Sequence, residues 1–225
     1  MKLIEYTDSD LMWLALADNI AGELNRALMM HDRATLAVPG GTTPGPAFDV
    51  LSAIRLPWER VDVLLTDERW VPEDSPRSNA RLLRERFLVD AAAAANFMPY
   101  YREGESPDQA ISEIAGEIRA LCPLSIVLLG MGEDMHTASL FPGADNLKAA
   151  LKDGAPALMP MRAPGAEEPR VSLSAEALNG AMSKHLVILG DAKLDALKRA
   201  EEIDDPMRAP VSAVLDGLTV HWAKK

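Results

Sequence analysis

Five short apolar runs that alternate with longer amphipathic segments constrain the fold of this chain more than any other feature. The runs fall at residues 34–38, 61–66, 124–129, 185–189 and 218–222, and their continuous Val, Leu and Ile content is typical of strands buried on both faces. Residues 9–30, 78–88, 107–121 and 191–203 instead have the apolar spacing of helices. This alternation predicts an α/β fold with a mainly parallel sheet that is covered by helices.

The segments between residues 1 and 225 favour one continuous domain. The first helical segment carries its apolar spacing on Leu11, Leu14, Ala17, Ala21, Leu24 and Leu28, and Asp8 or Ser9 is placed to cap it. The alanine run at 91–95 and the Pro/Gly-rich stretch at 154–169 are predicted to be loops or edges, not linkers. A chain of 225 residues is long enough for one sizeable core, so we predict a single domain over residues 1–225.

Composition narrows the possible partners and the cell compartment. The formal net charge of -11 opposes non-specific binding to nucleic acid or to an anionic membrane, so an anionic substrate would need a local cluster of basic residues. The single cysteine, Cys122, has no partner for an internal disulfide and is predicted to be an inert core thiol. The N-terminus has no signal-peptide core and no run reaches membrane-spanning length, so we expect a cytoplasmic protein.

A carboxylate and an imidazole, Asp134 and His136, follow the strand predicted at 124–129. Gly130 and Gly132 allow a sharp turn there, and Asp134 is placed to cap a short helix that ends at 142–143. Ligands of parallel sheets bind outside the carboxyl ends of the strands, where His136 would face a pocket. The alternative is that Asp134 is only a cap and that His136 is structural. A dinucleotide fingerprint is excluded, because Met135 stands where the third glycine would be needed.

A glycine-rich turn follows the strand predicted at 34–38. Gly40, Gly41, Thr42 and Thr43 lead into a helix that is predicted to begin near Pro44. Such a turn presents backbone N–H groups and the positive end of a helix, which favours phosphate binding. The alternative is a plain βα turn. It is not a P-loop, since no Gly-Lys-Ser/Thr sequence follows.

Charged residues at three further places are candidates for substrate binding. Asp67, Glu68 and Arg69 follow the strand predicted at 61–66 and can hold a polyol and a phosphate, or can form only a surface ion pair. Arg170 precedes the apolar segment 171–174. Lys193 lies in the first turn of a predicted helix, where the macrodipole disfavours a cation unless an anion is bound nearby. A solvated lysine without a partner is the alternative there.

Together these segments resemble the 6-phosphogluconolactonase family, within the wider group that includes glucosamine-6-phosphate deaminase. The resemblance covers nearly the whole chain and lies, in the family's order, in Pro39-Gly40-Gly41-Thr42-Thr43-Pro44, Asp67-Glu68-Arg69, Ser78-Asn79, residues 130–142, Arg170 and Gly190-Asp191-Ala192-Lys193. The family usually has glycine between the Asp and the His, where this chain has Met135. A methionine at positive φ would be strained.

The resemblance implies a Rossmann-like open sheet of the NagB/RpiA/CoA transferase-like type, with helices on both faces. It implies hydrolysis of 6-phospho-D-glucono-1,5-lactone to 6-phosphogluconate, a pentose phosphate pathway step, by a monomer or weak homodimer without metal or organic cofactor. His136 would take the proton of the attacking water and Asp134 would orient it. Arg69, Arg170 and Lys193, with the turn at 40–43, are candidates for the phosphate site, and the choice among the three basic residues stays open.

Two other functions compete with lactone hydrolysis. The amino-sugar phosphate isomerase-deaminases carry Asn-Glu-Pro after their histidine, whereas this chain has Ser139-Leu140-Phe141-Pro142 and lacks that carboxylate. A non-catalytic sugar-phosphate sensor would usually be joined to a DNA-binding helix-turn-helix. This chain contains no such segment and no basic arm.

Overall fold

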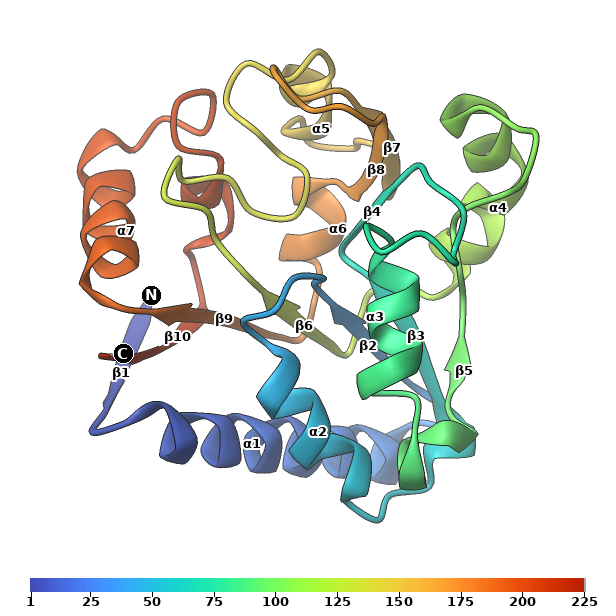
Figure 1. Cartoon of the computed structure of the whole chain (residues 1–225), viewed down its shortest axis with the longest axis vertical. Coiled ribbons are helices and arrows are strands. Elements are labelled where there is room, and N and C mark those ends of the chain that lie inside the picture. The colour runs from blue at the N-terminus through green and yellow to red at the C-terminus, as the bar shows by residue number, and fades with distance from the viewer. Residues whose placement is uncertain (225) are drawn as a thin grey trace.

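The computed structural model describes residues 1–224, and its centre is a seven-stranded sheet (Figure 1). All neighbouring strands in this sheet are parallel. Their order is β1 (Lys2–Tyr6), β10 (Leu218–Ala223), β9 (Ser183–Leu189), β6 (Ile126–Leu129), β2 (Ala34–Val38), β3 (Val61–Leu65) and β5 (Asn96–Phe97). The five predicted strands are therefore confirmed, and β1 and β5 were not predicted.

Helices cover both faces of the sheet. The connections through α1 (Ser9–Met30), α2 (Gly45–Ala53) and α3 (Asn79–Arg86) lead towards the β5 edge, whereas α4 (Pro107–Ala120) and α7 (Asp191–Ile203) lead towards the β1 edge. Since parallel crossovers are right-handed, the two groups belong on opposite faces. Figure 1 shows α1 and α2 on one side and α6 (Ala175–Asn179) and α7 on the other. The predicted α/β class is confirmed.

The direction of the crossovers changes between β2 and β6, which are neighbours in the sheet. In doubly wound sheets this change of direction opens a crevice at the carboxyl ends of the two strands, where ligands bind. Every residue of β2 and of β6 is buried, so this edge is held by rigid, fully packed strands. The loops that follow Val38 and Leu129 are therefore fixed at their bases.

A second, three-stranded sheet lies beside this edge. It has the order β4 (Asp67–Arg69), β8 (Arg170–Leu173) and β7 (Leu158–Met161), and both pairs are antiparallel. Residues 154–169, predicted to be a loop or edge, thus include a strand. The short sheet joins the segment after β3 to a segment about a hundred residues further along the chain.

Several local predictions were wrong. In α1, Asp8 is the cap as expected, but Leu11 and Leu14 are 51% and 52% exposed while Met12, Trp13, Leu16 and Ile20 are buried. The other four predicted positions, Ala17, Ala21, Leu24 and Leu28, are buried, so the predicted face is wrong only in the first turns of α1, which packs against the sheet and also against α2. The alanine run forms a 3-10 helix, η2 (Asp90–Ala94), and two further ones are η1 (Trp58–Arg60) and η3 (Pro210–Val214).

Among the helices of residues 1–224, none combines the length and the apolar content needed to cross a membrane. Cys122 is half-buried, and burial raises the pKa of its thiol, which agrees with an unreactive cysteine. The remaining helix, α5 (Leu147–Ala150), is a single turn between β6 and β7.

Candidate active site

A cavity of about 570 Å³ opens at the carboxyl ends of β2 and β6, where the crossovers change direction. The predicted site residues that line it are Gly40, Gly41, Thr42, Thr43, Asp67, Arg69, His136, Arg170 and Lys193. Asp134 adjoins the cavity through its contact with His136, whereas Glu68 does not line it. The fold therefore brings together segments that are more than 150 residues apart in the sequence.

The loop after β6 holds His136 and Asp134 as a close pair. The distance from His136 Nδ1 to Asp134 Oδ1 is 2.5 Å, and the two side chains are 28% and 51% exposed. The hydrogen bond from His136 holds the pKa of Asp134 below its usual value, so Asp134 is a carboxylate at neutral pH. With Nδ1 engaged, Nε2 is the ring nitrogen left for chemistry.

The loop that carries this pair is not helical. The short helix predicted to begin at Asp134 is absent, and the loop instead has turns at 133–134 and 138–139 and an isolated antiparallel bridge between Thr137 and Leu140. The Gly132 N–H donates to the His136 carbonyl at 3.0 Å, and the Met135 N–H donates back to the Gly132 carbonyl at 3.0 Å. These bonds close the loop on itself. A helix would instead direct the Asp134 side chain away from the imidazole two residues later.

Gly132 is required by the close approach of the pair. A Cβ atom at this position would lie 2.2 Å from both Asp134 Oδ1 and His136 Nδ1. Any larger residue would have to displace one of the two side chains. Met135, where the family usually has glycine, has φ of 65°, and Ala138 has φ of 48°. The loop thus keeps a left-handed conformation at Met135, with the strain that a side chain brings there.

The glycine-rich turn after β2 also lines the cavity. Gly41 has φ of +85°, and α2 begins directly afterwards, with Pro44 as a cap residue that makes no side-chain hydrogen bond. A Cβ on Gly40 would lie 1.9 Å from Asn79 Oδ1, so only glycine allows the Asn79 side chain to pack there. Pro44 and Pro46 have no N–H, and the Gly45 N–H donates to the Thr42 carbonyl at 3.3 Å, so the N–H groups that this turn can offer to an anion are those of residues 40–43, which line the cavity.

The Glu68 side chain binds backbone N–H groups of the protein and does not line the cavity. It is 1% exposed, and its carboxylate accepts the backbone N–H groups of Arg69, Asn79 and Ala80 at 2.7–2.8 Å. Burial raises the pKa of Glu68, although these N–H groups act in the opposite sense. Since Asn79 and Ala80 begin α3, Glu68 anchors the start of that helix beside the cavity.

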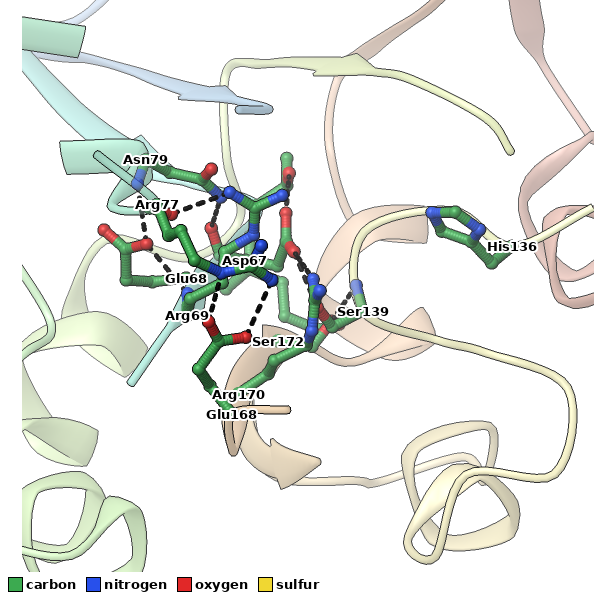
Figure 2. A network of polar contacts seen from close by, with 12 residues as sticks. Asp67, Glu68, Arg69, Arg77, Asn79, His136, Ser139, Glu168, Arg170 and Ser172 are labelled. Carbon is green, nitrogen blue, oxygen red and sulfur yellow. Dashed lines mark hydrogen bonds and ion pairs between the residues drawn. The ribbon is translucent and has the colours of Figure 1, made fainter. Parts of the chain in front are cut away.

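Arg69 and Arg170 concentrate positive charge at the cavity (Figure 2). Their Cα positions are paired in the antiparallel β4–β8 register, and the Nε atom of each is buried without a hydrogen-bond partner. Arg69 Nη1 donates to the Arg77 carbonyl at 2.7 Å, whereas Arg170 Nη1 lies 3.8 Å from Asp67 Oδ2. Burial lowers the pKa of Arg170. Both guanidinium groups therefore retain unused donors.

Asp67 is held by a serine that the sequence analysis did not single out as a site residue. Ser139 is fully buried, and its Oγ donates to Asp67 Oδ2 at 2.6 Å while its N–H donates to Ser172 Oγ at 3.1 Å. These contacts join the His136 loop to β4 and β8. Asn79 also lines the cavity and donates through Nδ2 to the Asp67 carbonyl at 2.8 Å. Both residues lie in the quoted motifs, which is the signal that could have marked them.

Lys193 is the third residue of α7, as predicted, and its ammonium reaches the cavity. Its Nζ donates to the Met131 carbonyl in the loop after β6, so it is not a free surface lysine. A cation in the first turn opposes the helix dipole, and the carbonyl partner offsets part of that cost. Within residues 1–224, no three His, Cys, Asp or Glu side chains gather in a way that could hold a metal ion.

The fold and the cavity define a doubly wound α/β protein in which an imidazole–carboxylate pair borders a cavity that Arg69, Arg170 and Lys193 also line. The family model for glucosamine-6-phosphate isomerases/6-phosphogluconolactonase matches residues 7–222, and the chain belongs to this family.

Individual relatives agree with the family match. The chain is 40% identical over 215 residues to a 6-phosphogluconolactonase of Rhizobium meliloti (strain 1021), which covers 93% of each chain. It is 40% identical over 224 residues to one of Mesorhizobium japonicum, covering 97% of this chain and 93% of the relative. The crystal structure of a 6-phosphogluconolactonase from Shewanella baltica OS155 has a TM-score of 0.92 at 30% identity and covers 100% of this chain and 97% of that one.

Proposed function

We propose that this chain hydrolyses 6-phospho-D-glucono-1,5-lactone to 6-phosphogluconate. The observation that carries the proposal is that the His136–Asp134 pair and the cations Arg69, Arg170 and Lys193 border one cavity. A proton acceptor and cations that border one cavity suit a lactone that also bears a phosphate. Relatives that are named 6-phosphogluconolactonase, covering nearly the whole chain, support the same reaction.

His136 is the general base in this proposal. Nδ1–H donates a hydrogen bond to Asp134, so Nε2 has a free lone pair. This lone pair takes a proton from water as the water oxygen attacks the lactone carbonyl. In this proposal a backbone N–H group of the loop after β6 stabilises the oxyanion that forms. When the ring C–O bond breaks, the imidazolium returns its proton to the departing ring oxygen, and the base is regenerated. No cofactor takes part in this sequence.

Arg69, Arg170, Lys193 and the turn at 40–43 bind the phosphate and orient the ring in this proposal. The two guanidinium groups have unused donors, and the turn at 40–43 adds backbone N–H groups. Asp67, fixed by Ser139, is placed to accept a hydroxyl hydrogen of the sugar. Glu68 acts only through α3, because its oxygens are occupied by backbone N–H groups.

The direct test is turnover of freshly generated 6-phosphogluconolactone, corrected for spontaneous hydrolysis. We expect His136→Ala to lower kcat by about 10² to 10⁴, the range for loss of a general base, while 6-phosphogluconate still binds. His31→Ala is the matched control, since His31 is exposed at the end of α1. Unchanged turnover in His136→Ala would remove His136 from the mechanism.

Substrate variants separate this function from its rivals. Unphosphorylated gluconolactone should have a lower kcat as well as a higher KM, because binding energy from the phosphate orients the reacting ring. Equal kcat/KM for the two lactones would contradict the phosphate site. Ammonia release from glucosamine 6-phosphate would favour the isomerase-deaminase alternative, and we expect none, because Ser139-Leu140-Phe141-Pro142 supplies no carboxylate after His136.

We propose further that residues 1–225 act as one cytoplasmic domain, as a monomer or weak homodimer that binds a small sugar phosphate and not nucleic acid. The formal net charge of -11 opposes binding to nucleic acid. Sedimentation velocity across a hundredfold concentration range would reveal a stable oligomer if there is one.

A further inference from the structure

Phe141 contacts both the proposed base and one of the proposed phosphate ligands. The His136 imidazole stacks on the Phe141 ring, with centroids 3.9 Å apart and an interplanar angle of 23°. The Arg170 guanidinium lies over the same ring, with Cζ 5.1 Å from its centroid. Figure 2 shows that His136 and Arg170 project from separate parts of the chain, the loop after β6 and strand β8. One aromatic ring therefore connects the two ends of the site.

We propose that Phe141 is a positioning residue that fixes the His136 imidazole and the Arg170 guanidinium relative to each other. The kinetic consequences rest on the proposed lactonase function. The stacking of Phe141 on His136 is a property of the ligand-free protein and does not depend on that function. In this proposal Phe141 exchanges no proton and contacts no substrate atom, and it acts only through His136 and Arg170.

His136 needs such a support because its other contacts leave one rotation free. The hydrogen bond to Asp134 fixes one distance at Nδ1, but a coupled change of χ1 and χ2 can still tilt the ring while that distance is kept, and Asp134 is itself half exposed. A ring stacked on the imidazole fixes its plane. That plane decides where the Nε2 lone pair points, and misplacement of a base by about 1 Å can cost about a hundredfold in rate.

Arg170 is also weakly held by polar contacts. Its Nε has no partner, and its Nη1 is 3.5 Å from Ser139 Oγ and 3.8 Å from Asp67 Oδ2. The negative face of an aromatic ring attracts a guanidinium without using its N–H donors. Phe141 can therefore orient Arg170 while leaving its donors free for an anion.

The ring of Phe141 rests on an anchored backbone. Ser139, two residues earlier, is bonded to Asp67 and Ser172, and the Ala144 N–H donates to the Phe141 carbonyl at 3.0 Å. Leu140 is fully buried, and Pro142 restricts the backbone of the residue before it. The segment that carries the Phe141 ring is therefore hydrogen-bonded to β8, the strand that carries Arg170.

The alternative is that Phe141 only fills space at the edge of the core. Phe141→Leu and Phe141→Tyr distinguish the two roles, since leucine keeps the apolar bulk without a ring and tyrosine keeps the ring. Phe97→Leu is the matched control, because the Arg84 guanidinium lies 5.0 Å from the Phe97 ring on β5, which does not line the cavity.

We expect Phe141→Leu to lower kcat by about 10- to 100-fold and to raise KM for the phosphorylated lactone several-fold. Phe141→Tyr should stay within about threefold of the parent on both constants, and Phe97→Leu should match the parent. Parent-like kcat in Phe141→Leu, or equal impairment in Phe141→Tyr and Phe141→Leu, would overturn the proposal.

NMR of the ligand-free protein gives a second readout that needs no activity. The ring current of Phe141 should shift the His136 ring protons upfield in the parent, and this shift should be lost in Phe141→Leu and kept in Phe141→Tyr. If the parent shows no upfield shift, Phe141 does not stack on His136 and the proposal fails. This outcome needs only the parent protein, so it holds even if a variant does not fold. If the parent hydrolyses no lactone but shows the shift, the proposed function fails while the ordering of His136 by Phe141 stands.

Discussion

Arg69 and Arg170 lie directly opposite each other on the antiparallel strands β4 and β8, and both line the cavity. Like charges in this relation destabilise a strand pair. The buried Nε atom of each lacks a hydrogen-bond partner, which adds a desolvation cost. An anion bound between the two would offset both costs, so the empty protein is expected to be less stable than its phosphate complex.

Phosphate should therefore stabilise the protein, and Arg170→Met should abolish most of the effect. We expect Arg170→Met to weaken 6-phosphogluconate binding by about 1.5 to 3 kcal/mol, the range for hydrogen bonds to a charged group. Without ligand its stability should change by less than about 1 kcal/mol, since relief of repulsion opposes the loss of the Asp67 contact. Thermal melts with and without phosphate and calorimetric titration measure both. Arg26→Met, on exposed Arg26, is the control.

Lys193→Ala should separate ligand binding from folding. Removing a cation from the first turn of α7 is favourable by about 0.3–1 kcal/mol, whereas losing the bond to the Met131 carbonyl is unfavourable by a similar amount. Stability should thus be nearly unchanged, while 6-phosphogluconate affinity falls by about 1.5 to 3 kcal/mol. Lys198→Ala, an exposed lysine on the same helix, should change neither. A lower melting temperature with parent-like affinity would make Lys193 a structural residue.

Ser139→Ala should affect both stability and turnover. Its Oγ is fully buried against Asp67 Oδ2, so its loss leaves a buried carboxylate oxygen without that donor and should cost about 1–3 kcal/mol. Because Ser139 ties the His136 loop to β4 and β8, kcat should fall as well. Urea unfolding and steady-state kinetics test this, with exposed Ser112→Ala as the control. Parent-like values for both quantities would contradict the role of Ser139.

A buried histidine outside the site should make stability pH-dependent. His221 is hydrogen-bonded to Tyr6 Oη at 2.8 Å and to His185 at 3.0 Å, and burial lowers its pKa to about 4. The usual histidine pKa is about 6.5. As pH falls from about 6.5 to 4, the unfolded chain therefore binds a proton that the folded protein excludes, and stability decreases by at most about 3 kcal/mol. Above that range His221 adds no pH dependence.

His221→Asn should remove this part of the pH dependence, because asparagine does not titrate. The free energy of unfolding, measured by urea at pH 7.5 and at pH 5.0, should differ less in the variant than in the parent. His31→Ala should keep the parent's difference, since His31 is exposed. An unchanged difference in His221→Asn would show that His221 is not the group responsible.

The sequence by itself determined the parallel sheet, most helices and the two glycine-rich loops. Strands buried on both faces need continuous apolar residues, and helices need an apolar stripe, so both leave a periodic signal in neighbouring residues. The loop residues Gly41 and Gly132 follow the strands directly, so local sequence was enough to place them at the carboxyl ends. The interpretation of Asp134 as a helix cap failed because the same residue types also suit the closed turn that the chain adopts.

Only the tertiary structure decided how the charged residues are used. Strands β4 and β8 are too short to leave a periodic signal, and their pairing joins residues 67–69 to residues 170–173. Glu68 and Asp67 are adjacent, yet one caps α3 and the other faces the cavity, because the pleat of β4 directs them to opposite sides. The stacking of Phe141 on His136 likewise needs the loop to be tied to β8. Such contacts depend on the packing of the whole chain, since no local pattern encodes which distant segments meet.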